Sequence, residues 1–365
     1  MNNLFFNSRL ITQMSFTIAL VSVFLFNACS SNQHKEQIPK IEITQDEDYK
    51  RIDITVDGQP FTSYLYTDTI ADLKKTVLYP IYSADGSIIT RGFPLETRPG
   101  ERMDHPHHIG FWLNYGEVND LDYWGNSNAI PPERADKMGI IRNHNIDLIK
   151  KGRGSATLKV TEYWLKPNGQ PLLKENTTFI FRADKNVRIV DRITTLTAMD
   201  EEVLFHDTKE GMMAIRTARA FEFPSDKPLN LSDAQGNMEE VPVMDNKIAT
   251  GQYINSNGVT GLDVWGKRAE WCSLSGTMDN KNISIVIFDH PGNVGHPSYW
   301  HARGYGLFAI NPLGQNTFSK GKETLNFTLE PKESVTLQYR LAILSGPADK
   351  TRIDSVYKQF LDEVK

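Results

Sequence analysis

The chain has 365 residues, of which 39% are hydrophobic and 23% charged, and its 40 basic and 45 acidic side chains give a formal net charge of -5. This is the composition of an ordinary globular protein, and it excludes the collagen-like, coiled-coil and intrinsically disordered classes. Because no basic excess is available to neutralise phosphates, nucleic acid is not an expected partner.

The first 28 residues have the pattern of a secretory signal peptide. Arg9 supplies the positive start, residues 14–26 form an apolar run too short to span a bilayer, and Ala28 precedes Cys29. A small residue before a cysteine, followed by a polar stretch, resembles a bacterial lipobox. We therefore expect an exported protein of the periplasm or outer membrane, anchored through lipidated Cys29. Cleavage at the same junction by ordinary signal peptidase is the alternative.

Two hairpins are predicted early in the mature chain. Residues 49–56 alternate in polarity, and Asp57-Gly58 then turns the chain into residues 61–66. The second hairpin series consists of strands over 156–165, 172–181 and 187–197, with turns at 167–169 and 184–186. Such spacing predicts a mainly β fold, a sandwich of antiparallel strands.

Later segments continue the β pattern and end in one helix. Further strands are predicted over 109–113, 283–288 and 305–310, with a hairpin pairing 324–329 with 334–344. Asp349 can cap a C-terminal helix whose apolar stripe is Ile353, Val356, Tyr357, Phe360, Leu361 and Val364. The expected organisation is a signal peptide over 1–28, a polar tether over 29–45, a β domain over 46–346 and a helix over 347–365. Segments 125–134 and 226–261 are expected to be long loops.

Seven histidines fall in three short segments, which are the candidate functional regions. The first segment, 98–112, contains Pro99 and Pro106, carries His105, His107 and His108, and ends in Trp112. The second, 205–212, packs His206, Asp207, Lys209 and Glu210 next to a glycine. The third, 289–306, contains His290, His296, Tyr299, Trp300, His301 and Arg303. Aromatic rings can stack on a sugar ring, while His, Asp, Asn and Arg bond its hydroxyl or anionic groups.

Several chemistries lack their motifs in this sequence. It contains no GxSxG elbow, P-loop, GxGxxG after a first strand, HExxH or CxxC pattern. Cys272 stands beside Trp271 without a histidine motif, so we interpret it as a small buried hydrophobic residue rather than a nucleophile. Covalent serine or cysteine catalysis is therefore disfavoured.

At the three histidine segments the sequence resembles a bacterial family of unknown function designated methane oxygenase PmoA. The resemblance rests on HPHHIGFW at 105–112, EGMMAIR at 210–216 and HPSYWHARGYGLFA at 296–309, with Asn311-Pro312 following. It covers about residues 64–345, and it departs from the family at Gly304, where Asp is usual. The resemblance implies a galactose mutarotase-like β-supersandwich that binds a sugar in a cleft, with His and a carboxylate as acid and base.

The leading hypothesis is an exported carbohydrate-active enzyme of hydrolase, lyase or epimerase type, whose three histidine segments converge on one cleft. Proton transfer near neutral pH is within reach of histidine without much perturbation of its pKa. The candidate catalytic residues are His107, His108, His206, Glu210 and His301. The candidate substrate-binding residues are Trp112, Asp207, His296, Tyr299, Trp300, Arg303 and Asn311.

Two alternatives stay open at this point. The first is a metal-dependent hydrolase, lyase or oxygenase with zinc or non-haem iron, whose ligands would come from His105, His107, His206, Glu210 and His301. The second is a sugar-binding lipoprotein without chemistry. In each case the expected ligand is a sugar or glycan, and the membrane is contacted only through the lipid anchor. The sequence leaves the substrate, the reaction and the oligomeric state open.

Overall fold

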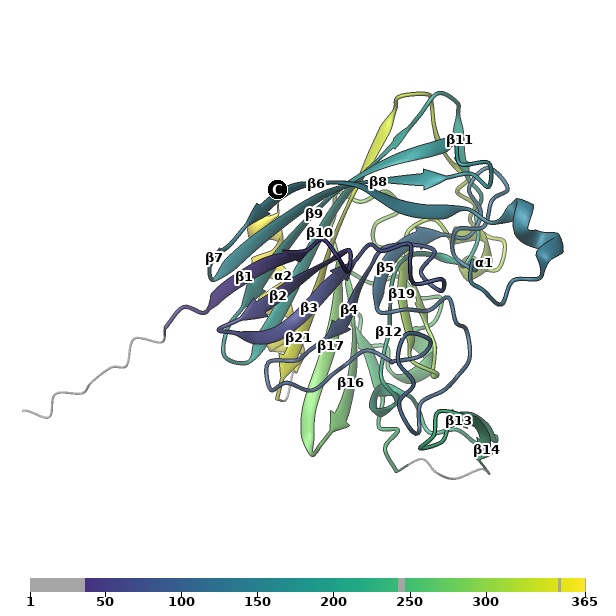
Figure 1. The fold of residues 1–365 in the computed structure, drawn as a ribbon. Coiled ribbons are helices and arrows are strands. Elements are labelled where there is room, and N and C mark those ends of the chain that lie inside the picture. Colours follow the sequence, from purple (N-terminus) through teal and green to yellow (C-terminus); the bar gives the residue numbers. More distant parts are fainter. Residues whose placement is uncertain (1–36, 242–246, 347–348, 365) are drawn as a thin grey trace, which may run out of the picture. The chain divides into compact units, whose positions relative to one another are not determined.

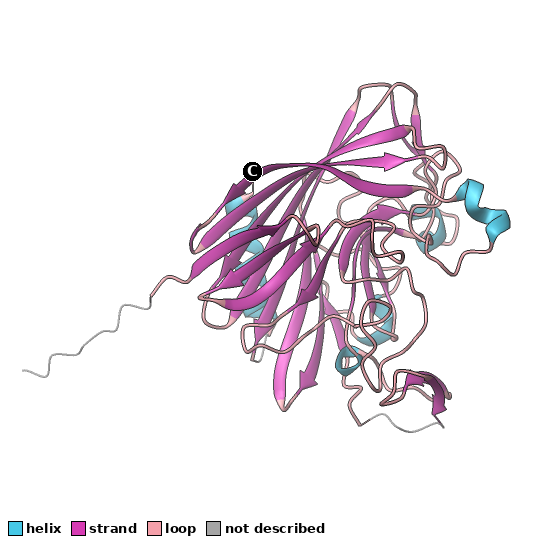
Figure 2. Cartoon of the chain, in the orientation of Figure 1, coloured by secondary structure: helices cyan, strands magenta, loops and turns pink. Residues whose placement is uncertain are grey.

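The computed structural model describes residues 37–241, 247–346 and 349–364, so Cys29 and the predicted signal peptide lie outside the described residues. From Ile38 onward the described chain forms one compact unit built on two large antiparallel sheets (Figures 1 and 2). The mainly β fold with a C-terminal helix, predicted from strand spacing, is confirmed. Within the described residues, no helix is both long and apolar enough to cross a membrane.

The first sheet, here called sheet A, has nine strands. In spatial order they are β18 (Tyr299–Ala302), β19 (Leu307–Asn311), β12 (Gly211–Arg216), β5 (Phe111–Tyr115), β4 (Val77–Ile81), β3 (Gln59–Leu65), β2 (Arg51–Val56), β1 (Lys40–Asp46) and β7 (Gly152–Arg153). The predicted hairpin at Asp57-Gly58 is confirmed as the β2–β3 pair. Because β1 begins at Lys40, the folded part starts inside the predicted tether.

The second sheet, here called sheet B, has eight strands. In spatial order they are β15 (Gln252–Asn255), β16 (Trp271–Met278), β17 (Lys281–Asp289), β21 (Ser334–Ser345), β10 (Val187–Ala198), β9 (Pro171–Ala183), β8 (Ser155–Leu165) and β6 (Ile140–Lys150). The predicted series of strands and turns between residues 156 and 197 is confirmed as β8, β9 and β10.

One hairpin prediction is wrong. Residues 327–329 form β20 (Phe327–Leu329), which pairs with β11 (Val203–Phe205), whereas β21 lies between β17 and β10 in sheet B. The turn at 330–332 therefore sends the chain into a different sheet. The segment predicted as a long loop over 226–261 also contains strands, namely β13 (Leu229–Ser232), β14 (Met238–Val241) and β15.

The main core lies between the two sheets, because alternate residues of each strand point inward. On β21, Leu337, Tyr339 and Leu341 belong to this core, while Ala342 and Leu344 face the opposite side of sheet B. There the helix α2 (Lys350–Glu363) covers the sheet with its apolar stripe, and the Asp349 side chain caps it by accepting from the Arg352 amide. The other helical elements are short: α1 (Gln315–Ser319) and the 3-10 turns η1 (Pro132–Lys137), η2 (Arg219–Phe221) and η3 (Gly261–Val264).

Candidate functional site

The side of sheet A that faces away from the core carries the histidine segments. On β5, Phe111, Leu113 and Tyr115 point into the core, so Trp112 points to the outer side. There Trp112 packs with Trp124 and with apolar residues of β12 and β19, so aromatic rings cover the outer side of the sheet at this point.

The first histidine segment forms a turn whose backbone is held by two buried cations. The Arg91 guanidinium, with a side chain only 1% exposed, donates to the carbonyl oxygens of residues 102, 104, 105 and 108 at 2.7–3.3 Å. The Lys75 Nζ donates to the His107 carbonyl at 2.6 Å. His105 has a φ of 45°, so the turn departs from extended backbone there. We call residues 102–108 the histidine turn.

Asp104 fixes the same turn through its side chain. Its Oδ1 accepts from Arg91 Nη1 at 2.7 Å and from Arg216 Nη2, on β12, at 2.6 Å. Burial alone would raise the pKa of this carboxyl, but His105, Arg216 and Arg91 together hold it well below its usual range. Asp104 is therefore a carboxylate that neutralises two guanidinium groups, each almost fully buried.

A column of stacked rings joins the first histidine segment to the third. The His105 ring lies parallel to Tyr305 on one side and to His108 on the other, with centroids 5.1 and 4.9 Å apart. His108 continues the column onto Trp112, at 5.6 Å. Arg216 lies 4.9 Å above the Tyr305 ring and contacts His108 Nδ1 at 3.3 Å. Because a guanidinium can only donate, His108 Nδ1 accepts and Nε2 carries the proton.

Burial keeps the imidazoles of His107 and His108 neutral. It is the main cause that lowers the pKa of His107 to about 3 and that of His108 well below its ordinary value, with the nearby cations adding to the effect. His108 Nε2 is buried without a hydrogen-bond acceptor among the described residues. His108 is enclosed by rings, and it is placed to position its neighbours rather than to touch a ligand.

The second and third segments meet at His301 and Glu210. His301 lies on β18, is 4% exposed, and its Nδ1 donates to the Lys209 carbonyl at 3.0 Å. This bond places the proton on Nδ1 and leaves Nε2 as an acceptor. The nearer carboxylate oxygen of Glu210 is 3.9 Å from Nδ1, and Lys209 forms an ion pair with Glu210. Burial lowers the pKa of His301 to about 4, although the Glu210 charge opposes this.

The remaining residues predicted for the site lie in supporting positions. His206 contacts Asp120 at 3.2 Å, and Asp207 accepts from the amides of Asn316 and Leu325. The other hydrogen bonds hold loops: His296 Nδ1 contacts Asp289 at 3.0 Å, and Asn311 donates to the Thr208 carbonyl and accepts from the Leu313 amide. Tyr299 stacks on Phe318 beneath Arg268.

Trp300 requires a correction. It was predicted to bind substrate, but its side chain is fully buried in the core between the sheets and donates to the Ala269 carbonyl. Neighbours on a strand face opposite sides, so the outward position of His301 places Trp300 inward. Trp112 does face the outer side, but it is covered by other rings and its indole donates to Asn114.

Lys75, Arg91, Asp104, Arg216 and Tyr305 are parts of the arrangement that sequence reasoning did not select. Burial lowers the pKa of Lys75 to about 7, and its ammonium lies 5.1 Å from the Trp112 ring centroid. A charged residue within or next to an apolar strand could have pointed to such positions, as Arg216 does at the end of β12.

The ligands proposed for a metal site do not form a cluster in the described part of the chain. Within residues 37–241, 247–346 and 349–364, no group of three or more His, Cys, Asp or Glu side chains is arranged to hold a metal ion. Of the proposed ligands, His301 donates its Nδ1–H to the Lys209 carbonyl and His206 contacts Asp120.

A pocket of about 510 Å³ lies beside the ring column. It includes the turn between β18 and β19, at Arg303, Gly304 and Tyr305, and its lining is completed by Arg102, Phe223, Pro224, Ser225, Asp226, Leu262, Trp265 and Ala302. We call it the Arg303 pocket. Tyr305 thus belongs to both the pocket and the ring column, and the charge of Glu210 acts on both Tyr305 and His301.

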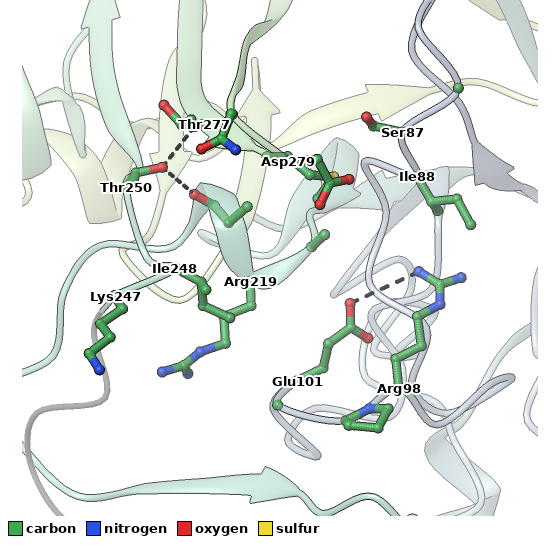
Figure 3. A pocket seen from close by; sticks show the side chains of 17 residues that line it. Ser87, Ile88, Arg98, Glu101, Arg219, Lys247, Ile248, Thr250, Thr277 and Asp279 are labelled. Carbon is green, nitrogen blue, oxygen red and sulfur yellow. Dashed lines mark hydrogen bonds and ion pairs between the residues drawn. The ribbon is translucent and has the colours of Figure 1, made fainter.

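A second cavity, of about 660 Å³, lies elsewhere on the domain (Figure 3). In Figure 3 Arg98 and Glu101 face one another, and the Thr250 hydroxyl donates to the Ala220 carbonyl and accepts from the Thr277 amide. None of the residues predicted for the functional site lines this cavity. Its size alone therefore does not make it the candidate site.

Comparison with solved structures gives several distant likenesses. The α-galactosidase AgaB of Geobacillus stearothermophilus is 12% identical over 84% of this chain, with a TM-score of 0.40, but the chain spans only 41% of its length. Galactose 1-epimerase of Lactobacillus acidophilus is 12% identical over 85% of this chain and 100% of its own, with a TM-score of 0.33. A galactose mutarotase-like protein of Clostridium acetobutylicum gives 12% identity, coverage of 83% and 98%, and a TM-score of 0.35.

At these identities and TM-scores the likenesses carry no argument about activity. A search of curated proteins gave no match. A family model, by contrast, matches residues 51–358, which include all three histidine segments and most of both sheets. The chain therefore belongs to that family, which is described as a family of unknown function, DUF6807.

Proposed function

We propose that this protein is an exported carbohydrate-active enzyme that works by general acid/base catalysis at His301 and Glu210. The observation that carries the proposal is the orientation of His301, whose Nδ1 is fixed by the Lys209 carbonyl while a carboxylate stands 3.9 Å away. Ala302 and Arg303, the next two residues of the chain, line the Arg303 pocket, whereas His301 and Glu210 are not among its lining residues. A histidine held in one tautomer next to a carboxylate is an arrangement suited to proton transfer.

Each group has a distinct role in this proposal. With a pKa of about 4, His301 is neutral near pH 7, so its Nε2 can accept a proton from a sugar hydroxyl or an activated water. Glu210, with a side chain 29% exposed, orients His301 or exchanges a second proton with the ligand.

We assign the proton-transfer role from the surroundings of each histidine. His108 is enclosed in the ring column, and His206 is paired with Asp120, so neither is assigned a proton-transfer role. His107 contributes its carbonyl to Lys75, and we assign it to the support of the histidine turn. Export, the Cys29 anchor and the narrower resemblance to the PmoA-designated family remain part of the proposal; loss of membrane fractionation in Cys29→Ala would support the anchor.

The test uses the mature protein and a panel of glycans and glycosides. For His301→Gln and Glu210→Gln we expect turnover to fall by about 10²- to 10⁴-fold, the range for loss of a general acid or base. The matched control is His144→Gln, because His144 is an exposed histidine on β6 of the other sheet. Thermal unfolding of each variant separates loss of chemistry from loss of fold.

Two outcomes would overturn the proposal. Full turnover in folded His301→Gln would show that this histidine is not part of the chemistry. Sugar binding by the wild type without turnover on any panel member would favour the non-catalytic sugar-binding alternative.

A further inference from the structure

We propose that the Arg303 pocket binds the anionic group of an acidic sugar, a uronic acid carboxylate or a sugar sulfate, through Arg303 and Trp265. This inference rests on the proposed function and names its substrate class. Two residues that line the pocket, Arg303 and Trp265, carry donors without an acceptor among the described residues.

The first donor is the Arg303 guanidinium. Arg303 is exposed, and within the described residues its side chain has no ion pair or hydrogen bond, only a contact over the Tyr305 ring at 5.8 Å. Neighbouring arginines are paired: Arg102 with Glu222 at 2.6 Å and Arg216 with Asp104 at 2.6 Å. A guanidinium is suited to two-pronged recognition of a carboxylate or sulfate, and here that capacity is unused.

The second donor is the indole N–H of Trp265. Its Nε1 is buried and has no hydrogen-bond partner within the described chain, while the ring packs edge-on against Phe318 at 5.3 Å. A buried N–H without an acceptor is costly, so such an atom beside a pocket indicates a place for a ligand oxygen.

The turn that carries Arg303 is fixed by its backbone. The Arg303 carbonyl accepts from the Tyr253 hydroxyl at 3.3 Å, and the Gly304 carbonyl accepts from the Phe223 amide at 2.8 Å. Gly306, with a φ of 83°, ends the turn where a Cβ would lie 2.8 Å from the Thr217 hydroxyl. The guanidinium therefore extends from a rigid base.

The other charges of the pocket are compatible with this ligand. Glu222 lies outside the lining and is paired with Arg102, and the carboxylate in the lining is the exposed Asp226. A carboxylate accepts hydrogen bonds from hydroxyl groups, so Asp226 can bind the sugar hydroxyls while Arg303 takes the anionic substituent.

The experiment measures binding, by Trp fluorescence or calorimetry, of galacturonate, glucuronate and galactose 6-sulfate against galactose and glucose. We expect the acidic sugars to bind at least about tenfold more tightly, a preference that Arg303→Ala removes and that weakens as salt is added. Gly304→Asp should also remove it, because a Cβ at Gly304 meets only ordinary contacts at 3.4 Å and longer, and the new carboxylate would pair with Arg303. The control is Arg153→Ala, an exposed arginine on β7.

The outcomes separate this inference from the proposed function. Equal affinity for neutral and acidic sugars, or a preference that survives Arg303→Ala, would overturn the inference. If neutral sugars are nevertheless turned over in a His301-dependent way, the proposed function still stands. Conversely, Arg303-dependent binding of acidic sugars without His301-dependent turnover would keep the anion site and reject the catalytic proposal. Comparing uronates with the sulfated sugar identifies which anion is preferred.

Discussion

The rings of His105 and Tyr305 lie parallel, at an interplanar angle of 3° and with centroids 5.1 Å apart. This contact joins the histidine turn to the β18–β19 turn, two segments that are remote in the sequence. Arg216 also lies over the Tyr305 ring, 4.9 Å from its centroid. The position of the Arg303 pocket relative to the histidines is therefore set by a stacked aromatic pair.

Asp104 should be a principal stabilising residue of this region. Its replacement by Asn would leave the buried guanidinium groups of Arg91 and Arg216 without their carboxylate. Removing one partner from a fully buried pair costs roughly 3–5 kcal/mol, and because a third of the Asp104 side chain is exposed we expect about 2 kcal/mol. Chemical denaturation at pH 7 measures this, with the exposed Asp48→Asn as control. An unchanged denaturation midpoint would contradict the prediction.

Glu162 should make stability fall as the pH rises. This carboxyl lies in the core between the sheets, where burial and the charge of Glu175 raise its pKa from 4.5 to about 8, and it accepts from the hydroxyls of Tyr64 and Thr76. Between these two pH values the unfolded chain has released the proton and the folded chain retains it, so the free energy of unfolding decreases with pH. The contribution is complete below about pH 4.5.

The test is Glu162→Gln, which keeps the shape but cannot ionise. Between pH 4.5 and 8 we expect the unfolding free energy of this variant to decrease less with pH than that of the wild type. The exposed Glu239→Gln on β14 should retain the wild-type pH profile. Parallel profiles for wild type and Glu162→Gln would show that Glu162 does not hold its proton in the fold.

Lys75 should produce the opposite slope at higher pH. Its pKa falls from 10.5 to about 7 on burial, so between these values the unfolded chain binds a proton that the folded chain has lost. The free energy of unfolding then rises with pH, reaches its full value above about pH 10.5 and loses this contribution as the pH falls towards 7. Lys75→Met removes the ammonium and keeps an unbranched apolar stem.

We expect Lys75→Met to remove this rise between pH 7 and 10.5, so the variant gains most relative to wild type near pH 6. The loss of the bond to the His107 carbonyl, worth about 1 kcal/mol, is a constant offset that does not change the slope. Equilibrium unfolding at pH 6, 8 and 10 provides the measurement, with the exposed Lys159→Met on β8 for comparison. A slope identical to that of the wild type would refute the assignment.

Local patterns predicted most of the β architecture. The two early hairpin series have explicit turn residues, such as Asp57-Gly58 and Asn168-Gly169, and their strands pair as expected. The C-terminal helix followed from one cap and one apolar stripe. The pairing of β20 with β11 could not be predicted in this way, because adjacency along the chain favours a local hairpin and the actual partner is remote.

The candidate site could be predicted only in part. Dense histidines and aromatic rings marked segments that contact one another in the structure, through His105 with Tyr305 and His301 with Lys209. Which side chains of the four-residue strand β18 face the core could not be read from the sequence, and Trp300 faces it. Lys75 and Arg91 act on backbone carbonyls, and backbone acceptors leave no trace in residue identity. Charged residues that hold a loop through its backbone carbonyls can therefore be identified only from the structure.

The bonds from Arg91 and Lys75 to the carbonyls of the histidine turn have a thermodynamic consequence. Ordering a loop costs conformational entropy. In this protein the turn is ordered when the chain folds, because the buried side chains of Arg91 and Lys75 hold it in place without a ligand. A ligand that arrives at this face meets a turn already in one conformation. Its association rate is then governed by diffusion and orientation, without a preceding search among loop conformers.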